Sequence, residues 1–365
     1  MIKKPIYVTQ SFLPPVEEFE VRIRDIWESG HLTNNGPNVL KLESDLKAHL
    51  GVKHLFLVNN GTIALQIAIK ALELKGEVIT TPFSYVATVS SIVWEGCKPV
   101  FVDINSRNFC LDASKIEAAI TEKTTAILAT HVYGFPCDVV EIERIAKKHN
   151  LKVIYDAAHA FGVTIGDKSV LDYGDISTLS FHATKIFHTG EGGAIVTDND
   201  VLANRIEYMR NFGHNGPEAF QGVGINGKVS EFHAAMGLCV LPYMNDIVAN
   251  RRQAVAIYTE LLAVQEQLYL ITSEATVEHN AAYFPVVFPS EKILLQVVEA
   301  LKAKQIFPRR YFYPTLNTLP YVKLQQMPVA EDISVRILCL PLSSEISETE
   351  VREICGIIQN TLDAN

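Results

Sequence analysis

Short apolar runs alternate with segments of helical periodicity along the first half of the chain. The runs with the length and composition of buried strands lie at 54–58, 77–81, 98–104, 125–132, 151–156 and 178–182. Between them, apolar residues recur at helical spacing, most clearly at 61–74 and 140–150. Alternating strands and helices build parallel sheets with helices on both faces, so we predict an α/β fold with a mostly parallel sheet. Ligands of such sheets bind beyond the carboxyl ends of the strands.

The pattern changes in the last third of the chain. A long helical stretch covers about 230–264, followed by a strand at 281–288, a helix at 291–304 and a last helix at 347–362. With 365 residues, the chain exceeds the size at which one hydrophobic core usually stops growing. We therefore predict a large domain at 1–245 and a small C-terminal α/β domain at 246–365.

Charge and composition narrow the possible partners. The net charge of −9 is spread along the chain without a stripe of basic residues, which argues against a nucleic-acid partner. No stretch approaches 18 uninterrupted apolar residues and the first 20 residues lack the apolar run of a signal peptide, so we expect a cytoplasmic protein with no membrane partner. The six cysteines lie far apart without a C-x-x-C pair, which predicts reduced packing residues and no metal site.

The first segment with candidate chemistry lies at 58–65, where a predicted strand turns into a helix through Gly61 and Thr62. Exposed N–H groups at a helix start suit a phosphate group. A tight turn with a threonine cap would use the same residues, so this segment alone leaves both interpretations open.

The second segment, at 154–162, places Asp156 at the end of a predicted strand, ahead of small residues. A carboxylate there could hold a pyridinium N–H, which would keep the ring protonated and able to accept electrons. Capping of a helix is the alternative role for Asp156. His159 could reach a hydroxyl on the same ring, or it could be a hydrogen-bonded core residue.

The third segment, at 179–194, contains Lys185 among small and apolar residues, ahead of a glycine-rich turn into a strand. Partial desolvation lowers the pKa of a lysine and makes its amine nucleophilic. A solvated surface lysine is the alternative. Because Asp156 and Lys185 follow successive predicted strands, we expect them to meet at one edge of the sheet.

Together these segments resemble those of the DegT-type nucleotide-sugar aminotransferases, a branch of the fold-type-I pyridoxal 5′-phosphate (PLP) enzymes. NNGTIAL resembles their phosphate-binding turn, YDAAHAFG their aspartate segment and SFHATKIFHTGEGGAIVT their lysine segment. PFSYVAT and GVGINGKVSEFHAAMGLCVL match two further segments, and the matches run from about 33 to 314. The resemblance implies PLP fold type I, which is aspartate aminotransferase-like and has a seven-stranded sheet in the large domain.

Carried over position by position, the resemblance implies roles at the cofactor ring. Lys185 would be the catalytic residue that holds PLP as a Schiff base and moves the proton between cofactor and substrate. Asp156 would pair with the pyridinium, Tyr85 would stack on the ring, and His159 would lie near the ring hydroxyl.

The resemblance also implies a phosphate site and a partner subunit. Gly61, Thr62 and Ser180 would bind the cofactor phosphate. Asn226 resembles an asparagine that reaches the phosphate of the neighbouring subunit's cofactor, which implies a homodimer with shared active sites.

For the substrate, the resemblance is greatest to enzymes that aminate C4 of a dTDP-4-keto-6-deoxyhexose, because of the segment 33–37 and the histidine of SFHATK. The substrate-binding residues that it implies are Thr33, Asn34, His182, Lys228, Arg309 and Tyr313. Lys228 stands where the family more often has arginine, and Arg309 or Arg310 is expected at the diphosphate. Further aromatic and histidine side chains that could line the pocket, or pack in the core, are Phe83, His188 and Tyr311.

The resemblance implies a ping-pong transamination. L-glutamate would convert PLP to pyridoxamine 5′-phosphate and leave as 2-oxoglutarate, and the nucleotide-linked keto sugar would then take the amine, for biosynthesis of a surface polysaccharide or another glycan. The alternatives are amination at C3, a PLP-dependent sugar dehydratase and a non-catalytic regulatory PLP-binding protein. Lys185 argues against the dehydratase, because those relatives have histidine at its position.

Overall fold

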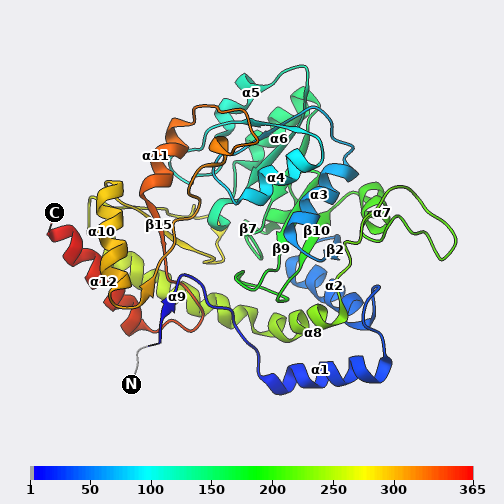
Figure 1. Cartoon of the computed structure of the whole chain (residues 1–365), viewed down its shortest axis with the longest axis horizontal. Coiled ribbons are helices and arrows are strands. Elements are labelled where there is room, and N and C mark those ends of the chain that lie inside the picture. Colours follow the sequence, from blue (N-terminus) through cyan, green and yellow to red (C-terminus); the bar gives the residue numbers. More distant parts are fainter. Residues whose placement is uncertain (1–3, 365) are drawn as a thin grey trace.

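The computed structural model describes residues 4–364 (Figure 1). The helices are α1 (Val16–Ser29), α2 (Pro37–Leu50), α3 (Gly61–Ala71), α4 (Val86–Trp94), α5 (Ile116–Ala119), α6 (Val139–His149), α7 (Asp200–Met209), α8 (Glu231–Val240), α9 (Met244–Leu262), α10 (Glu291–Lys302), α11 (Pro328–Arg336) and α12 (Glu348–Asp363). The strands are β1 (Ile6–Tyr7), β2 (His54–Val58), β3 (Glu77–Thr80), β4 (Lys98–Phe101), β5 (Thr124–Thr130), β6 (Lys152–Asp156), β7 (Thr164–Ile165), β8 (Lys168–Ser169), β9 (Ile176–Ser180), β10 (Gly193–Thr197), β11 (Tyr269–Leu270), β12 (Val277–Glu278), β13 (Phe284–Val287), β14 (Ile306–Phe307) and β15 (Ile337–Leu340).

The centre of the molecule is a seven-stranded sheet with the order β2-β10-β9-β6-β5-β3-β4. The pairings of β3, β4, β5, β6 and β9 are parallel, whereas β10 runs antiparallel to both its neighbours. This confirms the predicted α/β class and mostly parallel sheet. All six predicted strands are present, although the one predicted at 178–182 begins and ends two residues earlier, as β9.

Helices cover both faces of this sheet, as the apolar runs predict. Alternate residues of one strand face opposite cores: Ile127 of β5 packs in the core that includes α6, and Leu128 packs in the core beneath α3 and α7. A third core, which includes α2 and α8, lies over the β2 end of the sheet. The strands are therefore buried on both sides, which explains why they read as continuous apolar runs.

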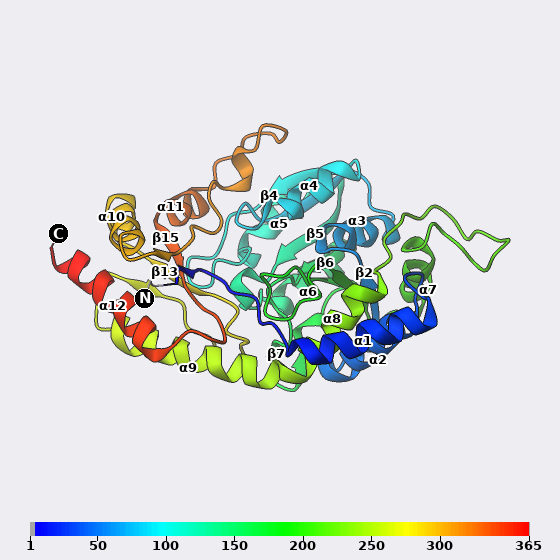
Figure 2. The same ribbon diagram turned by 60° about the horizontal axis from the view of Figure 1, so that its bottom comes forward.

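The C-terminal part has a sheet and a core of its own. β11, β13 and β15 form an antiparallel sheet, against which α9, α10 and α12 pack in one hydrophobic cluster. The helix α9 runs from the large sheet towards this part (Figure 2). The first strand, β1, pairs in parallel with β14, so the N-terminal segment is tied to the C-terminal part. The domain division at residue 245 stays a prediction.

The long helix predicted at 230–264 is two helices. A short 3₁₀ turn, Leu241–Tyr243, separates α8 from α9 and contains Pro242. Proline has no N–H for the helical ladder, so the α-helical hydrogen bonding is interrupted here, although Leu241 before it keeps helical backbone angles. Among the described residues, no helix is both long and apolar enough to cross a membrane. All six cysteines are buried and free, as expected for packing residues.

Candidate active site

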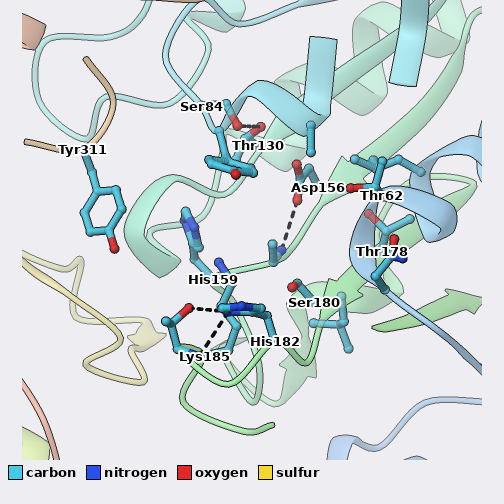
Figure 3. Close-up of a pocket in the computed structure, with 18 of the residues that line it drawn as sticks. Thr62, Ser84, Thr130, Asp156, His159, Thr178, Ser180, His182, Lys185 and Tyr311 are labelled. Carbon is cyan, nitrogen blue, oxygen red and sulfur yellow. Dashed lines mark hydrogen bonds between the residues drawn. The ribbon is translucent and has the colours of Figure 1, made fainter. Parts of the chain in front are cut away.

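A cavity of about 270 Å³ opens where the strands β5, β6 and β9 end and the helices α3 and α4 begin (Figure 3). Polar groups from these separate segments converge on it, together with an aromatic wall from the C-terminal part of the chain. The predicted residues that line it are Gly61, Thr62, Tyr85, Asp156, His159, Ser180, His182, Lys185, Arg309 and Tyr311. The position of the cavity follows the rule for sheets of this type.

The start of α3 forms one side of the cavity. The side chain of Asn60 accepts a hydrogen bond from the backbone N–H of Ile63 at 2.8 Å and caps the helix. A Cβ atom on Gly61 would lie only 2.9 Å from the Cβ atom of Ser180, so the close approach of this turn to β9 requires glycine. The N–H groups of the first helical turn, with the hydroxyls of Thr62 and Ser180, provide donors for a phosphate.

Asp156 lies at the bottom of the cavity, at the end of β6, with an exposed fraction of 6%. Burial raises the pKa of its carboxyl group, while a hydrogen bond from Thr88, the N–H of Ala158 and the charge of Lys185 act in the opposite direction. Oδ2 accepts from the Thr88 hydroxyl at 2.8 Å, and Oδ1 accepts from the Ala158 N–H at 3.2 Å. A cationic N–H placed here would find a fixed, low-dielectric anion.

Lys185 follows β9 in the loop 181–192 and lines the same cavity. Its side chain is half-buried, and the protein packed around the amine lowers its pKa to about 8, while the negative charge of Asp156 opposes the shift. A larger fraction of the amine is therefore neutral, and nucleophilic, near neutral pH than for an ordinary lysine. The expectation that Asp156 and Lys185 meet at one edge of the sheet is correct.

The remaining predicted cofactor residues differ in exposure. His159 is buried, and its Nδ1 atom accepts a hydrogen bond from the backbone N–H of Tyr133 at 3.2 Å. Burial and the nearby charge of Lys185 hold the pKa of this imidazole well below its usual value. Tyr85, just before α4, is 58% exposed at the edge of the cavity, where a flat ring has room to stack against its side chain.

His182 and Arg309 stand nearer the opening. The Nδ1 atom of His182 is 2.8 Å from the Thr184 hydroxyl, and its Nε2 atom is 3.7 Å from a carboxylate oxygen of Glu191. The guanidinium of Arg309 lies over the ring of Tyr311, 4.8 Å from its centre. Both side chains are therefore held by neighbours while they border the cavity.

Arg310 does not compete with Arg309 for a ligand. Its guanidinium bonds to Glu291 at 2.8 Å and to the carbonyl oxygen of Val335 at 3.0 Å. The guanidinium also lies 3.7 Å from the ring centre of Tyr313, so Arg310 and Tyr313 contact each other outside the cavity. Of the two adjacent arginines, Arg309 is the one at the cavity.

Several predicted residues lie outside the cavity of this chain. They are Thr33, Asn34, Asn226, Lys228 and Tyr313, and all but Lys228 are exposed. Asn226 and Lys228 lie at the base of the loop 211–228, where the Lys228 amine donates to the Asn226 side chain at 2.8 Å. Their roles stay predictions. His188 and Phe83 are buried packing residues, and the Nε2 atom of His188 bonds to the carbonyl oxygen of Phe12.

The sequence did not single out several polar lining residues. Thr130 ends β5 and Thr178 lies in β9, and both stand beside Asp156 in the strand register. A hydroxyl residue at the end of an apolar strand is a signal that could have identified Thr130. Further polar lining residues are Ser84, Glu191 and Tyr283, and Phe312 adds an apolar one.

These residues fit PLP and no metal ion. The cavity joins a phosphate-binding helix start, a buried carboxylate for a ring N–H, and an amine with a lowered pKa for the aldehyde. Within residues 4–364, no cluster of His, Cys, Asp and Glu has the arrangement of a metal site. The groups that the resemblance assigns to different parts of one cofactor thus come together from three separate segments.

Comparison with known proteins also indicates an aminotransferase, and the matches cover nearly the whole chain. Residues 15–359 match the model of the DegT/DnrJ/EryC1/StrS aminotransferase family. A dTDP-4-amino-4,6-dideoxy-D-glucose transaminase of Shigella dysenteriae is 44% identical over 364 residues, which cover 98% of this chain and 99% of the relative. A transaminase of the same name from Escherichia coli is 39% identical, with 98% and 99% covered.

Solved structures agree with the sequence comparison. The crystal structure of DesI in the presence of its TDP-sugar product superposes with a TM-score of 0.93 at 32% identity, and the match covers 98% of this chain and 93% of that one. PLP fold type I, predicted from the resemblance, is confirmed. The chain belongs to the DegT/DnrJ/EryC1/StrS aminotransferase family and is a PLP-dependent sugar aminotransferase.

Proposed function

We propose that this enzyme transfers the amino group of L-glutamate to C4 of a dTDP-linked 4-keto-6-deoxyhexose, most simply dTDP-4-keto-6-deoxy-D-glucose. The observation that carries the proposal is the juxtaposition of Asp156 and Lys185, a buried anion and an amine with a lowered pKa, in one cavity. The substrate follows from the names of the two transaminases that are 44% and 39% identical over nearly their full lengths.

The chain's own groups divide the chemistry between them. PLP, when bound, withdraws electrons from the carbon that carries the amine, so that a proton on this carbon can be removed. The N–H groups and hydroxyls around Gly61 hold the phosphate, and Asp156 holds the ring N–H. The Nζ atom of Lys185 would accept this proton and return it to the carbon on the other side of the amine nitrogen, which its lowered pKa favours near neutral pH.

Two anionic substrates alternate in this cavity, and Arg309 is the cation best placed to meet them. Glutamate has two carboxylates, and a sugar nucleotide has a diphosphate. The amine of Lys185 would bind the cofactor, whereas the guanidinium of Arg309 borders the cavity on the side of the C-terminal part. We assign Arg309 to the substrate anion and His182, Thr33 and Asn34 to the sugar.

A homodimer with shared sites is part of the proposal. Asn226 is exposed on the loop 211–228, which projects away from the body of the chain (Figure 2). This loop carries the exposed apolar residues Phe220 and Val223, and Trp94 at the end of α4 is 80% exposed. Exposed apolar groups of this size favour burial against a second subunit. Asn226 and Lys228 would then act in the partner's cavity.

Two alternatives use the same scaffold. Amination at C3 would need only a different seating of the sugar, and a regulatory PLP-binding protein would need no turnover. The two transaminases that are 44% and 39% identical to this chain over nearly their full lengths favour an enzyme over a passive receptor. We place the enzyme in the cytoplasm, where six free cysteines persist and where it would serve the synthesis of a surface polysaccharide or another glycan.

The test begins with the purified protein and PLP. Absorption spectra before and after L-glutamate, with assay of released 2-oxoglutarate, establish the first half of the reaction. The aminated enzyme is then offered dTDP-4-keto-6-deoxy-D-glucose and its 3-keto isomer, and the products are identified by mass spectrometry and NMR. A 4-amino product supports the proposal, a 3-amino product supports the first alternative, and no exchange with any amino donor would promote the regulatory one.

A further inference from the structure

Three buried hydroxyl groups form a chain that ends on Asp156. The Thr130 hydroxyl donates to Ser84 at 3.1 Å, Ser84 is 2.8 Å from Thr88, and Thr88 donates to Oδ2 of Asp156 at 2.8 Å. All four residues are at most 6% exposed. Thr130 ends β5, Thr88 lies in the first turn of α4, Asp156 ends β6, and Ser84 lies in the loop before α4. We call Thr130, Ser84 and Thr88 the hydroxyl chain.

The direction of each bond in the hydroxyl chain follows from the ionisation of Asp156. A carboxylate only accepts, so the proton of Thr88 must point at Asp156. A hydroxyl has one proton, so Thr88 can only accept from Ser84, and Ser84 can only accept from Thr130. All three bonds therefore point towards the carboxylate, and each polarises the next in a low-dielectric interior.

We propose that Thr88, oriented by Ser84 and Thr130, is a positioning residue that keeps the buried Asp156 carboxylate ionised. The proton between Asp156 and the ring nitrogen of the cofactor then stays on the nitrogen. The proposal rests on the proposed placement of that nitrogen at Asp156. A carboxylate and a pyridine nitrogen share one proton, and the less basic partner gives it up. Donation by Thr88 makes the carboxylate the less basic partner, whereas burial alone would favour a neutral acid beside a neutral ring.

Few other groups can act on Asp156. The Ala158 N–H is a second donor, and the ammonium of Lys185 is the charge that lowers the pKa of Asp156. The other ionisable groups around the cavity are His159, His182, Glu191, Arg309 and the phenols of Tyr85, Tyr283 and Tyr311.

The variant Thr88→Val removes the hydroxyl with little change in shape. Losing a hydrogen bond to a charged group should raise the pKa of Asp156 by roughly one to two units. Thr88→Ser should restore the normal value, and Ser84→Ala should give a smaller shift in the same direction. Thr80→Val is the matched control, since the buried hydroxyl of Thr80 donates to the carbonyl oxygen of Leu128 and does not touch the cavity.

Two measurements on the full chain test the proposal without reading activity. In apoenzyme labelled with ¹³C at aspartate carboxyl carbons, NMR titration gives the pKa of Asp156, whose signal is identified by its loss in Asp156→Asn. In enzyme loaded with PLP labelled with ¹⁵N in the ring, NMR reports whether the ring nitrogen is protonated. We expect a raised pKa in Thr88→Val apoenzyme and a smaller protonated fraction in the loaded enzyme, with normal values in Thr88→Ser and Thr80→Val.

The outcomes separate this proposal from the proposed function. An unchanged pKa of Asp156 in Thr88→Val overturns the role of the hydroxyl chain, whatever the cofactor does. An unprotonated ring nitrogen in the unmodified enzyme overturns the placement of the cofactor, and the hydroxyl chain is then judged on the apoenzyme alone. If Thr88→Val does not fold, Thr88→Cys, a weaker donor, must give an intermediate shift, and an unchanged value there also overturns the proposal.

Discussion

The backbone N–H of Tyr133 donates a hydrogen bond to the Nδ1 atom of His159 at 3.2 Å. Tyr133 has a left-handed backbone conformation with φ of 56°, which turns this N–H towards the imidazole. A ring nitrogen that accepts carries no proton, so the neutral imidazole of His159 has its proton on Nε2. The burial that lowers the pKa of His159 keeps the ring neutral. The side chain is thus fixed as a neutral donor at the cavity.

The first prediction concerns this histidine. We expect ¹⁵N NMR of the apoenzyme to show His159 neutral, with its proton on Nε2, throughout pH 6–8. His159→Gln keeps an N–H donor and should bind PLP within about threefold of the normal affinity, whereas His159→Leu should bind about tenfold more weakly, the worth of one hydrogen bond. Titration of His159 near pH 6.5, or equal PLP binding by the glutamine and leucine variants, would contradict this role.

The second prediction concerns the pH dependence of cofactor capture. Only the neutral amine of Lys185 attacks an aldehyde, so the rate at which apoenzyme captures PLP should rise with pH and level off above pH 8, because its pKa is about 8. At pH 7 the neutral fraction is about 300-fold larger than for a lysine of normal pKa. Stopped-flow absorbance measures this rate.

The effect of Asp156 on the pKa of Lys185 provides a control for that experiment. The charge of Asp156 raises the pKa of Lys185, opposite to the effect of burial. Asp156→Asn should therefore shift the midpoint of the capture rate below pH 8, while Lys185→Ala should capture no PLP covalently. A midpoint near 10.5, the ordinary lysine value, would show that the amine is not desolvated.

The central part of the site could be predicted from sequence because it lies on strong periodic elements. The apolar runs at 54–58 and 151–156 end where their strands end, and the run predicted at 178–182 ends two residues after its strand, which ends at Ser180. The residues after parallel strands meet at one edge of the sheet. The aspartate, the lysine and the glycine turn therefore came together as expected. The resemblance supplied the cofactor and the substrate class, which periodicity alone does not contain.

The rest depends on packing between segments that are distant in sequence. Nothing in the pair Arg309-Arg310 tells which side chain reaches the cavity, because the partners that tie down Arg310 are Glu291 and Val335. The hydroxyl chain could not be predicted from the sequence either, because Ser84 and Thr130 are 46 residues apart. Sequence patterns identify elements and motif residues, while side-chain partners across elements require the fold.

The third prediction separates the two adjacent arginines. Arg309→Gln should raise the KM for the sugar nucleotide by roughly 10- to 100-fold, because a hydrogen-bonded contact to a charged group is lost, with a smaller effect on kcat. Arg310→Gln should leave that KM unchanged within about twofold and lower the melting temperature, because Glu291 loses its partner. Steady-state kinetics and thermal unfolding of both variants give the answer. The opposite pattern would move the anion site to Arg310.

The fourth prediction tests whether Asn226 acts in the partner's site. Lys185→Ala and Asn226→Ala should each be nearly inactive alone. When the two variants are unfolded, mixed and refolded together, about half of the dimers contain one chain of each kind, and one of the two sites in such a dimer has both native residues. We expect recovery of about a quarter of the normal activity. No recovery beyond that of Asn226→Ala would mean that Asn226 acts within its own chain, or that the chain is not a dimer.

The fifth prediction concerns a buried ion pair beside the phosphate turn. The guanidinium of Arg210, with 2% of its side chain exposed, contacts Glu43 of α2 and donates to the carbonyl oxygen of Leu57 at 3.1 Å. Glu43 also accepts from the backbone N–H of Leu57 at 2.8 Å. The pair therefore joins α2, β2 and the end of α7, next to the start of α3.

Breaking this pair leaves an unpaired charge in the interior. We expect Arg210→Met to lower the free energy of unfolding by about 3–5 kcal/mol, because Glu43 keeps its charge without a cation. The double variant Glu43→Gln with Arg210→Met removes the stranded charge and should recover much of the loss. Lys41→Met, which breaks an exposed pair with Asp45, should cost less than about 0.5 kcal/mol. Urea unfolding of the apoenzyme at one protein concentration measures the free energy of unfolding of all three variants. A double variant no more stable than Arg210→Met would show that packing of the arginine, and not its charge, stabilises this part of the fold.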